Sequence, residues 1–341
     1  MPERRHRPLF KLVPGISEVV QPLDLAELPT PIREEPVLAA RWGLERLHIK
    51  CDDLSSPIYG GSKLRNLEYF LGHALARSAT GVATMGPYGS HQALATAVYG
   101  RHAGLLTRAV LTPQPDVREG ALNKRLLPAL GMEVLRCNGF ASVPWAYLRA
   151  RFTPLGGKRP YWIPPGSADP LGVMGIIDGA FEVAAAIDRG ELPPPDDVVV
   201  PTGTCATAAG LYLGFAMAEL PIRVVAVRVV PLMITGANKL KRMARRTLKI
   251  LRDAGYRRPL QWGELLWVND CAAPGYGVAG PEARAAMAEV AEWGRMRTDV
   301  TYTGKSLALL HTGALSGRRV LFWNTFSATD PDPHRIDGSS R

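Results

Sequence analysis

Short apolar runs alternate with segments of helical periodicity along the first half of the chain. Strands are predicted at Leu47–Lys50, Val82–Met85, Thr107–Leu111 and Met132–Arg136. Helices are predicted between them at Lys63–Arg77, Ser90–Arg101 and Asn123–Leu130. Strands that alternate with helices of this length are typical of βαβ units, which build a parallel sheet.

The second half of the chain follows the same order after a Pro- and Gly-rich passage at Pro160–Gly172. The predicted elements are a helix at Val173–Arg189, an apolar strand at Val198–Val200, a helix that ends at Glu219, and strands at Arg223–Val230 and Val320–Trp323. A polar tail at Pro331–Arg341 is expected to be disordered. Since 341 residues exceed one typical core, we expect an α/β protein with two compact units.

The composition is that of a globular protein, with 46% hydrophobic and 21% charged residues. No apolar run reaches the length of a membrane span, and no apolar stretch of a secretory signal follows the basic N-terminus. The four cysteines are scattered and form no Cys-x-x-Cys pair. We therefore expect a cytoplasmic protein with reduced thiols, no metal site and no membrane partner.

Much of the net charge of +10 comes from a basic stretch at Lys239–Arg252. Such a stretch can indicate nucleic-acid binding. It is equally typical of the solvent-facing side of an amphipathic helix. The inward stripe of that helix would be Leu240, Met243, Ile250 and Leu251. We favour the helix, and expect no nucleic-acid partner, because no aromatic residue stands among the charges.

The first candidate for chemistry is Lys63, which opens a helix directly after two glycines in Gly60-Gly-Ser-Lys63. The positive end of a helix disfavours an ammonium group and lowers its pKa. A neutral amine is what a Schiff-base lysine requires. The glycines would let a flat ring approach the backbone. Alone, however, the motif is more typical of a surface lysine after a tight loop.

The second candidate is the turn that joins the strand at Val198–Val200 to the next helix. Small and hydroxyl residues form it: Gly203, Thr204, Cys205, Ala206 and Thr207. Backbone N–H groups at a helix N-terminus suit a phosphate. The turn has neither the Gly-Lys-Ser/Thr ending of a P-loop nor the dinucleotide motif G-x-G-x-x-G. Seen alone, it could equally be a plain βα turn.

Two further features are weaker when taken singly. Ser90 lies at a strand-to-helix turn, which lacks the second glycine of a nucleophile elbow, so a helix N-cap is the simpler interpretation. Tyr276 and Tyr302 each stand close to a glycine and could each be a structural aromatic residue of a turn.

In this order, the four features resemble the pyridoxal-phosphate-dependent D-cysteine desulfhydrase and 1-aminocyclopropane-1-carboxylate deaminase family, which is of the tryptophan-synthase-like fold type II. The resemblance runs from about Leu28 to Phe322. Its densest motifs are Gly60-Gly-Ser-Lys-Leu-Arg-Asn-Leu-Glu68, Gly89-Ser-His-Gln92, Pro201-Thr-Gly-Thr-Cys-Ala-Thr207, Gly275-Tyr-Gly277 and Tyr302-Thr-Gly-Lys-Ser306. It implies two open parallel-sheet domains of three-layer αβα type. The large domain would comprise residues 1–65 and 177–341, the small one 66–176, with the cofactor cleft between them.

The resemblance also implies roles for individual residues. Lys63 would carry pyridoxal 5'-phosphate as a Schiff base, and Gly203–Thr207 would hold its phosphate. Ser90, followed by His91 and Gln92, would face the substrate carboxylate or the reacting carbon, and His91 would also touch the cofactor. Tyr276 and Tyr302 would face the substrate, and Thr303 the pyridine nitrogen.

Thr303 favours one branch of this family. The deaminase branch typically has a glutamate there, which keeps the ring nitrogen protonated and strengthens the electron sink. A threonine hydroxyl cannot hold that charge. The weaker sink suits β-elimination of a good leaving group better than cyclopropane ring opening, so the desulfhydrase-like branch is favoured.

Several positions depart from the family pattern. Asn66 replaces a lysine that helps to neutralise the phosphate, and Ser62 replaces an asparagine. Cys205 and Ala206 replace glycines of the phosphate loop. Asn324–Ser327 stands where the family has His-Thr-Gly-Gly, close to the expected pocket. The last change bears on the substrate more than on the cofactor, and the loss of one cation at Asn66 should weaken cofactor binding only modestly.

The expected activity is therefore a pyridoxal-phosphate-dependent α,β-elimination on a small amino acid, which yields a keto acid, ammonia and the leaving group. Lys63 would be the general base, with Ser90, Tyr276 and Tyr302 assisting. Other reactions with the same cofactor remain open: deamination of 1-aminocyclopropane-1-carboxylate, β-replacement and racemisation. So do a non-catalytic cofactor-binding homologue and a basic nucleic-acid-binding protein. The family implies a homodimer.

Overall fold

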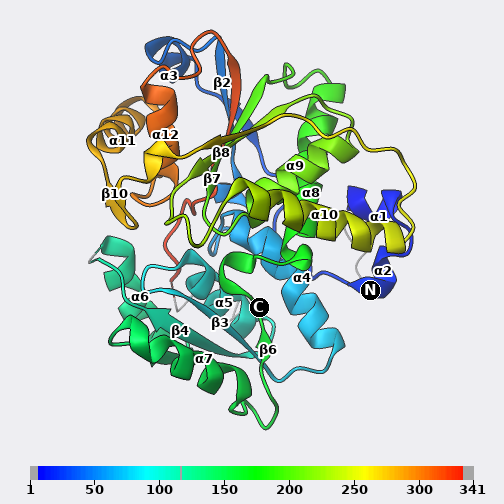
Figure 1. Cartoon of the computed structure of the whole chain (residues 1–341), viewed down its shortest axis with the longest axis vertical. Coiled ribbons are helices and arrows are strands. Elements are labelled where there is room, and N and C mark those ends of the chain that lie inside the picture. The colour runs from blue at the N-terminus through cyan, green and yellow to red at the C-terminus, as the bar shows by residue number, and fades with distance from the viewer. Residues whose placement is uncertain (1–6, 116, 333–341) are drawn as a thin grey trace.

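The computed structural model describes residues 7–115 and 117–332 and contains two separate parallel sheets (Figure 1). The six-stranded sheet has the order β1 (Ile32–Glu34), β2 (Arg46–Lys50), β12 (Arg319–Trp323), β7 (Asp197–Thr202), β8 (Arg223–Arg228) and β9 (Leu265–Val268). The four-stranded sheet has the order β5 (Glu133–Arg136), β4 (Leu106–Thr112), β3 (Gly81–Pro87) and β6 (Tyr161–Trp162). The predicted α/β class is confirmed.

The helices lie on both faces of the sheets. They are α1 (Pro8–Leu12), α2 (Ile16–Val19), α3 (Pro36–Arg41), α4 (Ser62–Ala76), α5 (His91–His102), α6 (Arg118–Ala129), α7 (Val143–Phe152), α8 (Pro170–Asp188), α9 (Ala206–Met217), α10 (Ala237–Asp253), α11 (Pro281–Trp293) and α12 (Thr303–His311). The elements that were not predicted are the strands β1, β6 and β9, the helices α1, α2, α3, α7, α11 and α12, and the short hairpin of β10 (Pro274–Gly275) and β11 (Val278–Ala279). Strand β1 also breaks the parallel pattern, because it pairs antiparallel with β2.

The period of two in strand β7 explains why the large sheet is covered on both faces. Val198 and Val200 pack into the core under α8, α9 and α10, whereas Val199 packs with α3, α11 and α12 on the other face. All three side chains are fully buried. A parallel strand that is buried on both faces reads as a continuous apolar run, which is the pattern seen here.

Helix α8 corrects one prediction, that no apolar segment is long enough to span a membrane. Its 19 residues are long and apolar enough by length and composition. The helix packs in the protein core instead, where it contacts α4, α9 and α10. Among its buried residues are Val173, Ile176 and Ile177, which belong to the core that covers the large sheet.

Helix α10 confirms the interpretation of the basic stretch as the solvated face of an amphipathic helix. Leu240, Met243 and Leu251 are buried, and Ile250 packs partly buried against the same core. Residues 333–341 of the predicted tail lie outside the described residues. The domain boundaries at 65/66 and 176/177 stay predictions; they fall within α4 and α8, which pack against each other.

Candidate active site

A cleft of about 600 Å³ lies where loops from the two sheets meet. Its lining includes residues that follow the carboxyl ends of β3, β4, β7, β8 and β12. Open α/β sheets typically bind ligands at this end of their strands. The cleft brings together these predicted residues: Lys63, Ser90, His91, Gln92, Gly203, Thr204, Cys205, Ala206, Thr207, Tyr276 and Tyr302.

Lys63 is the second residue of α4, and its amine points into the cleft. Its Nζ donates a hydrogen bond to the carbonyl oxygen of Gly166 at 2.9 Å. Burial lowers the pKa of the Lys63 amine to about 8. The sequence argument expected a lowered pKa from the helix N-terminus, but the desolvation of the amine is its cause here. Lys63 is therefore neutral at pH 7 in a larger fraction of molecules than an ordinary lysine would be, and the neutral amine is the form that attacks a carbonyl.

The two glycines before Lys63 have a different role from the one predicted. A Cβ at Gly60 would lie 2.1 Å from the carbonyl oxygen of Asp53, and one at Gly61 would lie 2.7 Å from that of Thr325. Gly61 also has a φ of 100°, in the region that favours glycine. The glycines thus allow two stretches of protein backbone to approach the start of α4, and that space is not left for a ring.

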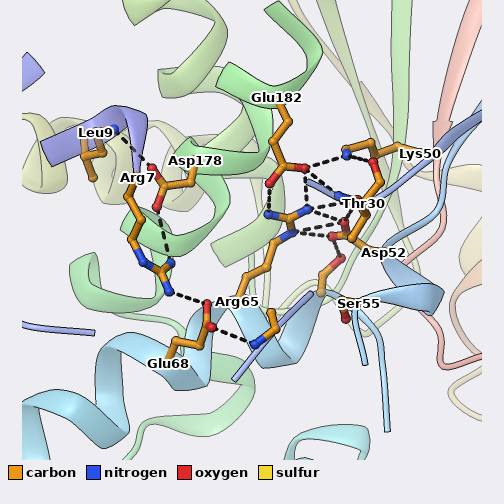
Figure 2. Close-up of polar contacts among 12 residues, drawn as sticks. Arg7, Leu9, Thr30, Lys50, Asp52, Ser55, Arg65, Glu68, Asp178 and Glu182 are labelled. Atoms are coloured by element: carbon orange, nitrogen blue, oxygen red, sulfur yellow. Dashed lines mark hydrogen bonds and ion pairs between the residues drawn. The ribbon is translucent and has the colours of Figure 1, made fainter. Parts of the chain in front are cut away.

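Buried ion pairs hold the start of α4 in place (Figure 2). Arg65, fully buried, pairs with Asp52 at 2.8 Å and with Glu182 of α8 at 2.7 Å. Asp52 also accepts a hydrogen bond from the hydroxyl of Ser62 at 2.7 Å and one from Trp323 Nε1 at 2.8 Å. Since Ser62 directly precedes Lys63, this network fixes the backbone from which Lys63 extends.

The turn from β7 into α9 has the features of a phosphate site. Cys205 is the N-cap of α9, yet no side chain caps the helix, so its first N–H groups are available to a ligand. Thr204 Oγ1 donates to the same Gly166 carbonyl oxygen as Lys63, at 3.1 Å. The amine and the turn therefore share one anchor. These groups fit pyridoxal 5'-phosphate: a neutral amine for its aldehyde and a helix N-terminus for its phosphate.

Cys205 occupies an unusual backbone conformation for a residue with a side chain. Its φ of 80° lies in the left-handed region, which costs a non-glycine residue about 1–2 kcal/mol. Its Sγ lies 3.1 Å from Thr235 Oγ1. The family's glycine at this position would avoid the strain, so the departure noted in the sequence has a structural cost.

Ser90, His91 and Gln92 enter the cleft at the start of α5. Ser90 is the N-cap, and its Oγ accepts a hydrogen bond from the N–H of Ala93, as the simpler interpretation predicted. Both the nitrogen and the oxygen of the Gln92 side-chain amide make hydrogen bonds. Its Nε2 donates to Thr96 at 3.1 Å, and its Oε1 accepts from Ser167 at 2.6 Å. These contacts orient Gln92 and leave one N–H of its amide for another acceptor.

His91 adds a titratable ring to this wall of the cleft. Its Nδ1 lies 2.9 Å from the hydroxyl of Tyr59, and its Nε2 lies 4.0 Å from Asp299. Burial lowers the pKa of His91, although the nearby Asp299 carboxylate opposes the shift. His91 is therefore predominantly a neutral imidazole at pH 7, with a nitrogen that can accept a proton.

Tyr276 and Tyr302 meet across the cleft from different elements, the hairpin loop and the start of α12. Their hydroxyl oxygens lie 3.1 Å apart. Burial raises the pKa of Tyr302 to about 12 and, together with the neighbouring phenol, raises the pKa of Tyr276 well above its usual value. Both phenols therefore keep their protons at neutral pH and can donate them.

Thr303 is fully buried at the start of α12 and is not among the residues that line the cleft. Its hydroxyl donates to Asp299 Oδ1 at 2.8 Å. The same carboxylate accepts hydrogen bonds from the backbone N–H groups of Thr301, Tyr302 and Thr303. A carboxylate is favourable at a helix N-terminus, so Asp299 anchors the start of α12 below Tyr302.

The sequence departures lie on different sides of this site. Asn66 is buried outside the cleft, and its amide donates to the carbonyl oxygen of Gly172 of α8. Thr325 lines the cleft, and its carbonyl oxygen accepts from the N–H of Ser62 at 3.3 Å. Phe326 packs edge-on against the His91 ring, with ring centroids 5.0 Å apart. The altered Asn324–Ser327 segment therefore contacts both Ser62, which directly precedes the lysine, and the histidine.

Sequence reasoning missed the roles of Gly166 and Asp299. The Gly166 carbonyl joins Lys63 to Thr204, and its segment lies in the Pro- and Gly-rich passage at Pro160–Gly172, for which no functional role was predicted. Gly166 and Ser167 both have positive φ, near 60°. The one available signal was that passage, where prolines and glycines mark a chain of special conformation.

Comparison with known proteins supports the cofactor fit. The family described as pyridoxal-phosphate dependent enzyme matches residues 23–325. The nocardicin C-9' epimerase of Nocardia uniformis subsp. tsuyamanensis is 33% identical, over 89% of this chain and 92% of its own. The D-cysteine desulfhydrase of Salmonella paratyphi B is 30% identical, over 85% and 88%.

A solved structure of a homologue of 1-aminocyclopropane-1-carboxylate (ACC) deaminase is similar over 97% of this chain and 98% of its own, with a TM-score of 0.78 and 27% sequence identity. The fold of this chain is accordingly that of the fold type II enzymes. The chain is an enzyme whose cofactor is pyridoxal 5'-phosphate, and it belongs to the pyridoxal-phosphate-dependent enzyme family.

Proposed function

We propose that this enzyme is a lyase that catalyses a desulfhydrase-like α,β-elimination on a small amino acid, with D-cysteine as the first candidate. The observation that carries the proposal is the Lys63 amine. It has a pKa of about 8 and lies in one cleft with Ser90 and the protonated tyrosine pair. A base and a proton donor in one cleft are what an elimination requires.

The cofactor, Lys63 and the two tyrosines would each carry out a different part of the reaction. Bound pyridoxal 5'-phosphate would supply the electron sink for the carbon next to the carboxylate. Neutral Lys63 removes the proton from Cα, and the electron pair of that bond expels the β-substituent. Tyr276 or Tyr302 donates a proton to the leaving sulfur. The released aminoacrylate takes up water and breaks down to a keto acid and ammonia.

The remaining residues would bind and orient. Gly203, Thr204, Cys205, Ala206 and Thr207 would hold the cofactor phosphate, and His91 would contact the cofactor; the contact expected of Thr303 is not proposed again, because its side chain does not line the cleft. The Ser90 hydroxyl and the free N–H of Gln92 would bind the substrate carboxylate, because both are donors fixed at the positive end of α5.

The test is a product analysis with purified holoenzyme and three substrates: D-cysteine, L-cysteine and ACC. We expect sulfide, pyruvate and ammonia in equal amounts from D-cysteine, at a higher rate than from L-cysteine. Lys63→Ala should abolish all three products. Release of 2-oxobutanoate and ammonia from the cyclopropane substrate, without sulfide from either cysteine, would replace this proposal with the deaminase.

A second candidate is epimerisation, favoured by the 33% identity to an epimerase. It shares the removal of the Cα proton and differs in the next step, where a proton returns to the opposite face. Incubation in heavy water with an amino acid that lacks a leaving group separates the two. Deuterium at Cα together with inverted configuration indicates an epimerase; deuterium without inversion, or no deuterium, does not.

The assembly and the compartment remain proposals as well. We keep the homodimer, the cytoplasmic location and the two domains formed by residues 1–65 with 177–341 and by 66–176. Sedimentation of the holoenzyme at several concentrations tests the dimer, and limited proteolysis tests the domain boundaries.

A further inference from the structure

The outward face of α10 carries two parallel rows of polar side chains. One row is Lys241, Arg245 and Lys249, and the other is Asn238, Arg242 and Arg246. Residues four apart on a helix are neighbours, about 6 Å apart along its axis. Five positive charges therefore stand side by side within roughly two turns of one helix.

Most of these charges have no partner of opposite sign. Within residues 7–115 and 117–332, Lys241, Arg242, Arg245 and Arg246 make no ion pair and no side-chain hydrogen bond, and only Lys249 pairs, with Asp253 at 2.8 Å. Like charges four residues apart destabilise a helix. A bound polyanion would relieve this repulsion, so the face is complementary to negative charge.

The cationic rows border a small hollow that is also lined by aromatic side chains from outside α10. The space along these side chains, about 600 Å³ and open to solvent, is lined by α10 alone from Asn238 to Lys249 and is called the groove below. Next to it, a hollow of about 150 Å³ is lined by Lys241, Arg245, Tyr212 and Trp262. The two rings are stacked, with centroids 4.9 Å apart and an angle of 24° between their planes. Lys241 and Arg245 line both spaces.

We propose that this face binds a nucleoside polyphosphate, with its phosphates along the groove and its base in the hollow. Arginines bind phosphate oxygens in pairs through their planar fork, and Arg242 and Arg246 stand one turn apart in the groove. The hollow offers two aromatic side chains and two cations, both of which favour a flat π-system. The site is separate from the cleft that holds Lys63.

The face is less suited to other occupants. A second copy that packed here about a two-fold axis would bring the same unpaired cations together. An anionic membrane would meet charge but no apolar side chain among the residues of the groove. A long single-stranded nucleic acid uses several aromatic platforms in succession, whereas one aromatic hollow adjoins these rows.

The test is calorimetric binding to the holoenzyme, in which the cofactor occupies the other phosphate site. The probes are ATP, tripolyphosphate, adenosine and a twelve-residue oligothymidylate. We expect ATP to bind more tightly than tripolyphosphate or adenosine, and added salt to weaken its binding. Arg242→Ala with Arg246→Ala should weaken ATP binding about tenfold or more. Trp262→Leu should reduce ATP binding to the level of tripolyphosphate.

The control is Arg125→Ala with Arg149→Ala, which removes two exposed arginines on α6 and α7 and changes the net charge equally. This variant should bind ATP as the original protein does. Equal weakening by both double variants, no binding of ATP, or tighter binding of the oligonucleotide than of ATP would each overturn the proposal. Equal affinity for ATP and tripolyphosphate would show that the base adds nothing to binding, and would overturn the proposal that the ligand is a nucleoside polyphosphate.

Discussion

Lys63 and Lys305 occupy comparable places in the fold and have opposite surroundings. Each stands in the first turn of a helix, α4 for Lys63 and α12 for Lys305. Burial lowers the pKa of each amine to about 8. Lys63 points into the cleft, while Lys305 is fully buried and donates to the backbone carbonyls of Ala272, at 2.8 Å, and Gly275.

The difference shows that a lowered pKa does not by itself identify a catalytic lysine. Both amines are deprotonated with similar ease, but only one has space for a reacting carbon. Lys305 instead joins the first turn of α12, which follows Tyr302, to the loop that carries Tyr276. It is therefore a positioning residue for the tyrosine pair. The predictions below test this division of roles.

The largest effect is expected from Lys63→Ala. Removal of the base and of the covalent anchor should lower kcat about 10³-fold or more. Borohydride reduction followed by peptide mass analysis should find the cofactor on Lys63 in the original protein and on no lysine in the variant. Lys305→Met is the matched control, because it removes an amine of similar pKa; it should keep the labelled Lys63. Label on Lys305 would reverse the assignment.

A second large effect is expected from Arg65→Met, which tests how the start of α4 is held. The change leaves the buried carboxylates of Asp52 and Glu182 without their arginine. Breaking a buried pair on one side costs about 3–5 kcal/mol, so the midpoint of denaturant unfolding should fall markedly. Arg189→Met is the control, because its pair with Glu191 is exposed to solvent and contributes little to stability. Similar losses in both variants would contradict the importance of burial.

The comparison of the two lysines also indicates what the sequence could reveal. The alternating pattern was sufficient for the α/β class and for the longer parallel strands, because each of these elements is a local feature with its own period, but it did not reveal the short strand β6 or the strand β9. Lys63, Ser90 and the residues of the phosphate turn could be predicted from the order of the motifs and the family resemblance, because each motif alone had a plain structural interpretation. The structure brings them into one cleft.

What the sequence could not reveal are the contacts between distant segments. Lys305 looks like any lysine after Thr303 and Gly304, since its partners lie about thirty residues away in the chain. The same holds for Asp52, which joins Ser62 to Trp323 of β12. The glycines at 60 and 61 correctly indicated that another group lies close to the backbone there. That group is protein backbone and not a ring, and only the tertiary structure shows this.

A moderate effect is expected from Lys305→Met, which keeps an unbranched side chain only one atom shorter and removes its donors. The carbonyl groups of Ala272 and Gly275 lose a partner, at a cost of about 1–3 kcal/mol in unfolding free energy. The loop with Tyr276 should loosen, so kcat should fall while KM changes less, and addition of a proton to the leaving group should become slower. An unchanged kcat for a substrate with a poor leaving group would refute the positioning role.

The smallest expected effect, counted per pH unit, is on the stability of the cofactor-free protein. Its unfolding free energy should rise with pH because of both lysines. Each amine has a pKa of about 8 in the folded state, against 10.5 for an ordinary lysine. Below pH 8 both states are protonated, and the folded state bears the full cost of the buried charge. Between pH 8 and 10.5 the unfolded chain binds more protons, so each lysine should add about 1.4 kcal/mol per pH unit to the unfolding free energy.

Denaturant unfolding at pH 7.5 and 9.5 measures this slope. Because buried thiols and phenols titrate in every variant alike, the difference between the original protein and Lys63→Ala or Lys305→Met isolates one amine. Each variant should lose the contribution of its own lysine and keep the other; a slope unchanged in the Lys305 variant would mean that its amine stays charged on those carbonyls.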